Sequence, residues 1–231
     1  MISSTFAERV IEFNARLCIE ESLPERIQAL NPFQAGSPSR DISERFYRRF
    51  YSDNKPRDLI LGINPGRLGA GATGIPFTDT KRLLSHCNMT CDFHLHEPSS
   101  VFVYEVIDAF GGTDKFYQRF FFSSVSPLGF VKINDKGKEI NYNYYDDKSL
   151  EEAVLPFIVQ SMQQVVSLGV NTERVYCLGT GKNFKFLQKF NKEHAFFGEI
   201  VPLEHPRYVM QYKNKKIGDY VEKYLNAFAQ T

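Results

Sequence analysis

Three glycines at positions 69, 71 and 74 have the GxGxxG spacing that cradles the pyrophosphate of a dinucleotide. The surrounding sequence argues against that chemistry. The segment "INPGRL" separates the glycines from the preceding apolar run, whereas a dinucleotide fingerprint forms the turn from strand to helix itself. No acidic residue ends a second strand about 20 residues further on, as such a site requires.

A second glycine-containing segment, "GTGK" at 179–182, resembles the end of a phosphate-binding P-loop. Tyr176 stands where that loop needs its first glycine, and Asn183 stands where it needs serine or threonine. We therefore interpret the segment as the N-terminus of a helix, whose free amides are able to hold a phosphate.

Histidines and cysteines crowd together in "HCNMTCDFHLH", which suggests zinc chemistry; they are His86, Cys87, Cys91, His94 and His96. Their spacing fits no usual pair of zinc-ligand pairs, and no second cluster exists elsewhere in the sequence. We interpret the segment as a helix end with one or two buried thiols, and we expect neither a metal nor a cofactor.

His205 stands directly after an apolar run and before Pro206. A single histidine is more often structural than catalytic. Its place after a predicted strand nevertheless favours a side chain that points into a cleft, where it can titrate or donate a hydrogen bond.

Four short apolar runs bounded by charged or turn-forming residues predict the strands that would position these groups, at 57–63, 119–125, 174–179 and 196–203. Amphipathic spacing and capping residues predict helices at 6–17, 42–51, 150–168, 183–190 and 217–228. The expected caps are Ser4 or Thr5 for the first of these helices, Asp147 and Ser149 for the third, and Thr180 for the fourth. Alternating strands and helices predict an α/β three-layer sandwich, with a central, mainly parallel four-stranded sheet flanked by helices. The polar segment 134–149 is expected to be a long surface loop.

Ligands of an open parallel sheet bind beyond the carboxyl ends of its strands. Polar segments follow all four predicted strands: "GINPGRLGAGATG", "SSVSPLG", "GTGKN" and "EHPRYVMQY". We expect these segments to converge on one site.

Composition indicates a soluble protein that remains in the cytoplasm. The 231 residues are 42% hydrophobic and favour one domain over 1–231. No apolar run approaches 18 residues, and the N-terminus lacks the pattern of a signal peptide. The four cysteines include no CxxC pair and are expected to be reduced thiols. A net charge of +1 means that any nucleic acid must be held by a local patch.

The segment "LGINPGRLGAGATGIPF" resembles the first motif of the uracil-DNA glycosylase superfamily. It is similar in particular to the single-strand-selective monofunctional uracil-DNA glycosylases, whose segment reads GMNPGPFGMAQTGVPF. Phe77 lies the same thirteen residues after Asn64 as in those proteins. "HPRY" resembles the second motif, which opens with His-Pro, and "LNPF…ERFYRR" is similar to the family's YNPL…VERY segment. The resemblance runs in order through nearly the whole chain.

The resemblance implies a monofunctional DNA glycosylase that flips out uracil and excises it by water attack, which initiates base excision repair. Asn64 would position the water, and His205 would donate to the base O2 as negative charge develops there. The backbone around Ile63, Gly66 and Gly74 would line the base pocket, and Phe77 would stack on the flipped base. No lysine stands at the catalytic positions, so a lyase step is not expected.

One residue departs from the family pattern. Where the family places a base-reading asparagine in a segment like HNLCPL, this chain has "SSVSPL", which puts Ser124 in that place. A serine hydroxyl is shorter than an asparagine amide and rotates freely, so the enzyme should discriminate less strictly between uracil and other bases. Xanthine and hypoxanthine become credible substrates alongside uracil. Arg67, where the relative has proline, is a further difference.

DNA contact is expected from "HPRYVMQYKNKK", in which Arg207 or Tyr208 would fill the gap left by the flipped nucleotide. Lys213, with Lys215 and Lys216, and also Lys182 would meet phosphates. Taken alone, the lysines of this segment read more simply as the solvated start of the last helix. The expected partner is single- or double-stranded DNA containing deaminated bases, without a membrane, and the expected state is a monomer that works with a bacterial-type nucleoid.

Two alternatives remain open from the sequence. The first is a DNA- or nucleotide-binding module that retains the fold but does not catalyse base release. Ser124 keeps this alternative open, because it replaces the base-reading asparagine of the family. The second, a small-molecule enzyme on a doubly wound sheet, would bind a nucleotide cofactor and show no affinity for DNA.

Overall fold

The computed structural model describes residues 4–230, and its centre is a parallel sheet of four strands. The strands lie in the order β3-β2-β6-β7, each parallel to its neighbour. Their bounds are Arg57–Gly62 for β2, Phe120–Ser124 for β3, Val170–Leu178 for β6 and Glu199–Leu203 for β7. The sheet predicted from the apolar runs is therefore confirmed. Every residue of β2 is buried, as expected of a strand with neighbours on both sides and helices above and below.

The helices around this sheet, in chain order, are α1 (Phe6–Arg16), α2 (Pro38–Phe50), α3 (Ala70–Thr73), α4 (Thr80–Cys87), α5 (Pro98–Phe110), α6 (Thr113–Arg119), α7 (Lys148–Ser167), α8 (Lys182–His194), α9 (Pro206–Tyr212), the 3-10 turn η1 (Asn214–Lys216) and α10 (Ile217–Ala229). No helix within residues 4–230 is long and apolar enough to cross a membrane.

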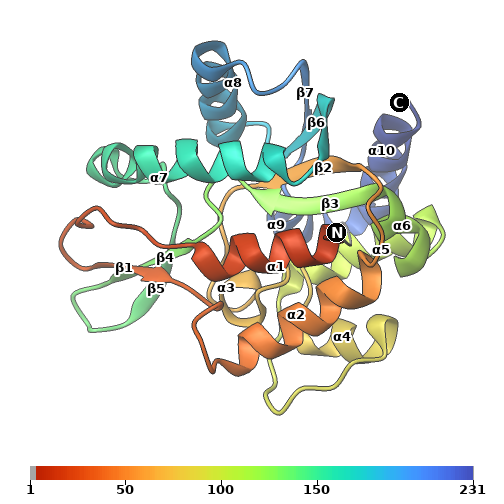
Figure 1. Cartoon of the computed structure of the whole chain (residues 1–231), viewed down its shortest axis with the longest axis horizontal. Helices are drawn as coiled ribbons and strands as arrows, with labels where there is room; N and C mark the ends of the chain where they lie inside the picture. The colour runs from red at the N-terminus through yellow and green to blue at the C-terminus, as the bar shows by residue number, and fades with distance from the viewer. Residues whose placement is uncertain (1–3, 231) are drawn as a thin grey trace.

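Helices cover both faces of the sheet (Figure 1). Neighbouring residues of β3 define the two outer layers, because successive side chains of a strand point to opposite faces. Phe121 packs against Phe6 of α1 and against Tyr51 at the end of α2, with ring centroids 5.2 and 5.8 Å away. Phe120 packs instead against Phe228 of α10, at 4.4 Å. The predicted three-layer α/β sandwich is confirmed.

Helix starts follow the capping residues of the sequence in two of three cases. Thr5 caps α1 in a reciprocal capping box with Glu8, and the Asp147 side chain accepts from the Ser149 amide at the start of α7. The predicted cap of α8, Thr180, is not used. Gly181 occupies that position and makes no side-chain bond, since it has no side chain to offer.

A second, antiparallel sheet lies beside the first, at the left of Figure 1. It joins β1 (Ile27–Leu30), β4 (Gly129–Ile133) and β5 (Glu139–Tyr142) in the order β1-β4-β5. The expectation of one long loop over 134–149 is therefore wrong, because β5 lies within it. Three of the four β5 residues are exposed, so no apolar run announces the strand.

The carboxyl ends of the parallel strands lie at one edge of the main sheet. Gly62 of β2 is in register with Ser124 of β3, and Leu178 of β6 with Leu203 of β7. After β3 the chain stays close to β2, because Val125 and Ser126 donate their amides to the carbonyls of Gly62 and Ile63. This edge brings together residues that are far apart in sequence.

Candidate active site

A cleft of about 720 Å³ opens at this edge of the sheet. Its walls come from the loop after β2, the end of β3, the start of α5, the segment after β4 and helix α9. The sequence-predicted residues that line it are Ile63, Asn64, Gly66, Phe77, Ser124, His205, Arg207 and Tyr208. The "GTGKN" segment after β6 was expected at the same site and is not among the lining residues.

Backbone groups of the β5 segment hold the Asn64 side chain in place. Its Nδ2 donates to the carbonyl of Tyr142 at 3.2 Å and, more weakly, to that of Pro65 at 3.3 Å. Its Oδ1 accepts from the amide of Tyr144 at 3.1 Å. These contacts fix the amide plane and distinguish its oxygen from its nitrogen. A carbonyl oxygen has two lone pairs, so Oδ1 retains one acceptor site for a further donor.

His205 caps α9 through its ring. Nδ1 accepts from the Arg207 amide at 3.1 Å, so the neutral ring carries its proton on Nε2. Burial, with a contribution from the Arg207 charge, lowers the pKa of His205 to about 4. At neutral pH the ring is therefore uncharged and offers an Nε2–H donor on the wall of the cleft.

Phe77 adopts a backbone conformation that is unusual for a bulky residue. Its φ is +53°, a left-handed value that costs on the order of 1–3 kcal/mol. The surrounding contacts hold it there, since the ring packs edge-on against Phe122 at 5.5 Å and against His205 at 5.8 Å. Strain of this kind is typical of functional sites, and it places an aromatic ring beside the histidine in the cleft.

Ser124 ends β3 directly beside Gly62. A methyl group at Gly62 would lie 3.3 Å from the Ser124 hydroxyl oxygen and 3.7 Å from the tip of the Phe77 ring. Gly62 is thus the point where the strand, the hydroxyl and the aromatic ring meet. The side chain that the end of β3 presents to the cleft is therefore a hydroxyl.

Close contacts, and not a nucleotide, account for the GxGxxG spacing. A side chain at Gly69 would overlap the Glu97 carboxyl group, and one at Gly71 would lie 2.8 Å from the Gly66 carbonyl oxygen. Gly74 has φ +70° and would collide with Phe33 and Ser43. Its amide donates to the Ala70 carbonyl within α3, and it is not among the residues that line the cleft. The structure places Gly74 at the end of α3, and its contact with the base stays a prediction.

The rim of the cleft carries aromatic and basic side chains from α9. Tyr208 and Tyr212 are 41% and 65% exposed, and their rings lie 5.5 Å apart. Arg207 is exposed beside them. Lys213 follows at the end of α9, and the Lys182 ammonium lies over the ring of Tyr145, a cleft residue, at 5.7 Å. Neither lysine lines the cleft itself.

Sequence reasoning misses several residues of the cleft, among them Glu97, Ser99, Asn141, Tyr142, Asn143, Tyr145 and Tyr212. Four of these lie in the segment expected to be a surface loop. Its tyrosines are the available signal, because a tyrosine ring favours burial with its hydroxyl on a polar partner. Asn141 also accepts from the Arg67 amide at 3.0 Å, which ties this segment to the loop after β2.

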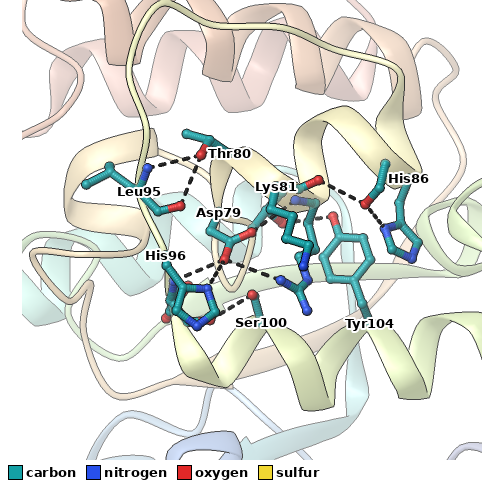
Figure 2. Close-up of polar contacts among 12 residues, drawn as sticks. Asp79, Thr80, Lys81, His86, Leu95, His96, Ser100 and Tyr104 are labelled. Atoms are coloured by element: carbon teal, nitrogen blue, oxygen red, sulfur yellow. Dashed lines mark hydrogen bonds and ion pairs between the residues drawn. The ribbon is translucent and has the colours of Figure 1, made fainter.

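Two of the histidines considered for zinc lie beside carboxylates. His96 Nδ1 lies 3.1 Å from Asp79 Oδ2, as Figure 2 shows. His86 Nε2 lies 3.2 Å from Asp108 Oδ2. Cys87 is buried at the end of α4, which confirms the interpretation as a helix end with a buried thiol. Over residues 4–230, no three His, Cys, Asp or Glu side chains are grouped so as to hold a metal ion.

The cleft thus combines a fixed amide, a neutral imidazole donor, an aromatic ring and a basic rim. Such a site can orient a water molecule, stabilise negative charge on a departing oxygen and stack a planar ring. Asn64 does not ionise near neutral pH, so it cannot act as a base and must act by orientation.

Comparison with known proteins agrees with this geometry. The family model described as the uracil DNA glycosylase superfamily matches residues 49–229. A crystal structure, wild-type SMUG2 of Pedobacter heparinus, is 51% identical to the chain, with a TM-score of 0.95. The alignment covers 100% of this chain and 98% of that one. No curated protein sequence matches.

Proposed function

Because the chain belongs to the uracil DNA glycosylase superfamily, we propose that it releases uracil and deaminated purines from DNA through attack of water on the sugar. Membership makes the chain a uracil DNA glycosylase, an enzyme of base excision repair that hydrolyses the N-glycosidic bond. Beyond membership of the superfamily, we infer the residues that carry the reaction and the further bases that the enzyme releases.

The observation that carries the mechanism is the fixed amide of Asn64. Two backbone contacts from the β5 segment, to Tyr142 and Tyr144, orient it, so its remaining acceptor site points in a defined direction. A water held there attacks C1′ as the bond to the base breaks and the sugar gains oxocarbenium character. Orientation of this kind replaces base catalysis, since an amide takes up no proton near neutral pH.

His205 stabilises the departing base. The Nε2–H of the neutral ring donates to the base O2, where negative charge develops. The Arg207 amide on Nδ1 keeps the ring in the tautomer that can donate. Removal of one such donor typically lowers the rate roughly a hundred- to thousandfold. Phe77 supplies the platform on which the flipped base stacks, and this offsets part of the cost of unstacking.

The range of bases follows from Ser124. A serine hydroxyl donates or accepts but does not impose the fixed pattern of an amide. The floor of the cleft therefore admits uracil without rejecting the larger xanthine and hypoxanthine. Arg207 or Tyr208 fills the space left by the flipped nucleotide, while Lys182 and Lys213 meet flanking phosphates, and one protomer suffices for these contacts.

Oligonucleotides with one deoxyuridine, deoxyxanthosine or deoxyinosine, each single- and double-stranded, test the proposal. Alkali then cleaves wherever a base has been released. We expect cleavage with uracil and with at least one deaminated purine. Cleavage with uracil alone would contradict the purine assignment, and DNA binding without any base release would favour the non-catalytic binding module.

The variant Ser124→Asn tests the role of that position. An amide restores a paired donor and acceptor, so the ratio of kcat/KM for uracil to that for xanthine should rise about tenfold or more. Ser124→Ala is the matched control, because it removes the hydroxyl and adds no amide. An unchanged ratio in Ser124→Asn would show that Ser124 does not read the base.

A further inference from the structure

Glu97 places an unpaired carboxyl group in the wall of the cleft. It lies against the backbone of Gly69, where a methyl group would come within 2.4–2.6 Å of its carboxyl atoms. Its Oε2 is buried and has no hydrogen-bond partner among the described residues. A buried polar oxygen without a hydrogen-bond partner destabilises the folded protein. A ligand that pairs with this oxygen would explain its presence in the wall of the cleft.

The main chain of Glu97 makes hydrogen bonds to neighbouring side chains, whereas its own side chain makes none among the described residues. Its amide donates to Asp79 Oδ2 at 3.0 Å, and its carbonyl accepts from the Ser100 hydroxyl at 2.7 Å. Figure 2 shows Asp79, His96 and Ser100 gathered at this point. Glu97 precedes α5 at the N-cap position but makes no side-chain cap bond. Capping therefore does not explain the carboxyl group.

The surroundings favour the neutral form of Glu97. Burial, with a contribution from the charge of Asp79, raises the pKa of Glu97 to about 8. Asp79 remains ionised, because the amides of Arg82 and Glu97 lower its pKa against the effect of burial. Other ionisable groups lie beside Asp79, at Arg82 and His96, and along the cleft, at His205, Arg207, Tyr142, Tyr145, Tyr208 and Tyr212.

We propose that Glu97 contacts the substrate as a neutral carboxylic acid, donating its O–H to an acceptor oxygen of the bound nucleotide. The inference rests on the proposed function, because the same cleft must hold that nucleotide. The oxygen belongs to a phosphodiester or to a base carbonyl, and both accept hydrogen bonds. An ionised carboxylate in this place would repel the DNA backbone and would offer no donor.

Three variants test this assignment on a single-stranded uracil oligonucleotide between pH 6 and 9.5. Glu97→Ala should lower kcat/KM about tenfold at pH 7, whereas Glu97→Gln, which keeps a donor and an acceptor, should stay within about threefold of the wild type. Glu105→Gln removes an exposed carboxylate from α5, the helix that follows Glu97, and is the control, with no change expected.

The pH profile separates contact with substrate from a structural role. The ratio of wild-type to Glu97→Gln activity should fall about tenfold as Glu97 ionises above pH 8. Taking this ratio cancels the ionisation of uracil itself. A constant ratio across this range would overturn the proposal, and Glu97→Gln provides this readout even if Glu97→Ala does not fold.

Two binding measurements identify the oxygen. An abasic-site analogue keeps the phosphates and lacks the base, so weaker binding of it by Glu97→Ala assigns a phosphodiester. Weaker inhibition by free uracil assigns a base carbonyl. No change in either would overturn the contact. Absence of base release by the wild type would instead contradict the proposed function, so the two failures are distinguishable.

Discussion

Backbone groups hold the side chains of Asn64 and His205, the two residues proposed to carry the reaction. The Tyr144 amide fixes the oxygen of Asn64, and the Arg207 amide fixes the proton of His205. The motifs of the sequence predict both residues, along with Phe77 and Ser124. They do not predict the groups that orient them, because Tyr144 is eighty positions from Asn64 and belongs to no motif.

The protonation state of the His205 ring should make the stability of the protein depend on pH. Its folded-state pKa lies near 4, below the ordinary value of 6.5, so the ring stays neutral until the pH falls well below 6.5. Protonation of Nδ1 then removes the acceptor for the Arg207 amide. Stability linked to this group is present above about pH 6.5 and is lost as the pH falls toward 4.

The corresponding pH–rate profile should have no inflection near 6.5. We expect kcat/KM for uracil release to be flat from pH 7 to about 5 and to fall closer to pH 4. Nitrogen chemical shifts of the His205 ring, followed over the same range, report the titration directly. A midpoint near 6.5 in either measurement would contradict the neutral donor.

At the scale of elements, the loop after β2 is shaped by what its glycines touch. Gly69 accommodates Glu97 and Gly71 accommodates the Gly66 carbonyl, so the composition reflects close packing against distant segments. The sequence indicates the four parallel strands, since each has its own apolar run. It does not indicate β5 or the place of Glu97, because both depend on contacts between remote parts of the chain.

The contact between Gly69 and Glu97 can be measured as a coupling. Gly69→Ala should lower the free energy of unfolding, since the new methyl group displaces the Glu97 carboxyl group. The same change in a Glu97→Ala background should cost less, by about 0.5–3 kcal/mol, because the clash is gone. Chemical denaturation of the four proteins completes the cycle. Additive effects would show that the two residues are not in contact.

At the scale of the whole molecule, the proposed DNA contacts come from a small basic rim and not from overall charge. The chain has 28 basic and 27 acidic residues, so long-range attraction to DNA is weak. The expected phosphate contacts lie at Lys213, at the end of α9, and at Lys182, at the start of α8. Composition predicts this local arrangement, whereas the position of each cation relative to the cleft follows only from the fold.

The salt dependence of binding tests the rim. For single-stranded DNA, each phosphate contact contributes a slope of about −0.7 in log affinity against log salt concentration. Lys213→Ala should reduce the slope by about that amount without changing the preference among bases. Lys192→Ala, a basic residue in the last turn of α8, is the matched control. A slope unaltered by Lys213→Ala would remove this lysine from the interface.

The proposed mechanism of base release depends on a water molecule directed by the fixed amide of Asn64. The most direct measurement is the single-turnover rate of uracil release from a single-stranded oligonucleotide by the wild type and by Asn64→Ala. Loss of orientation should lower this rate about a hundredfold or more, with DNA affinity largely retained. Equal rates in the two proteins would contradict the central role of Asn64.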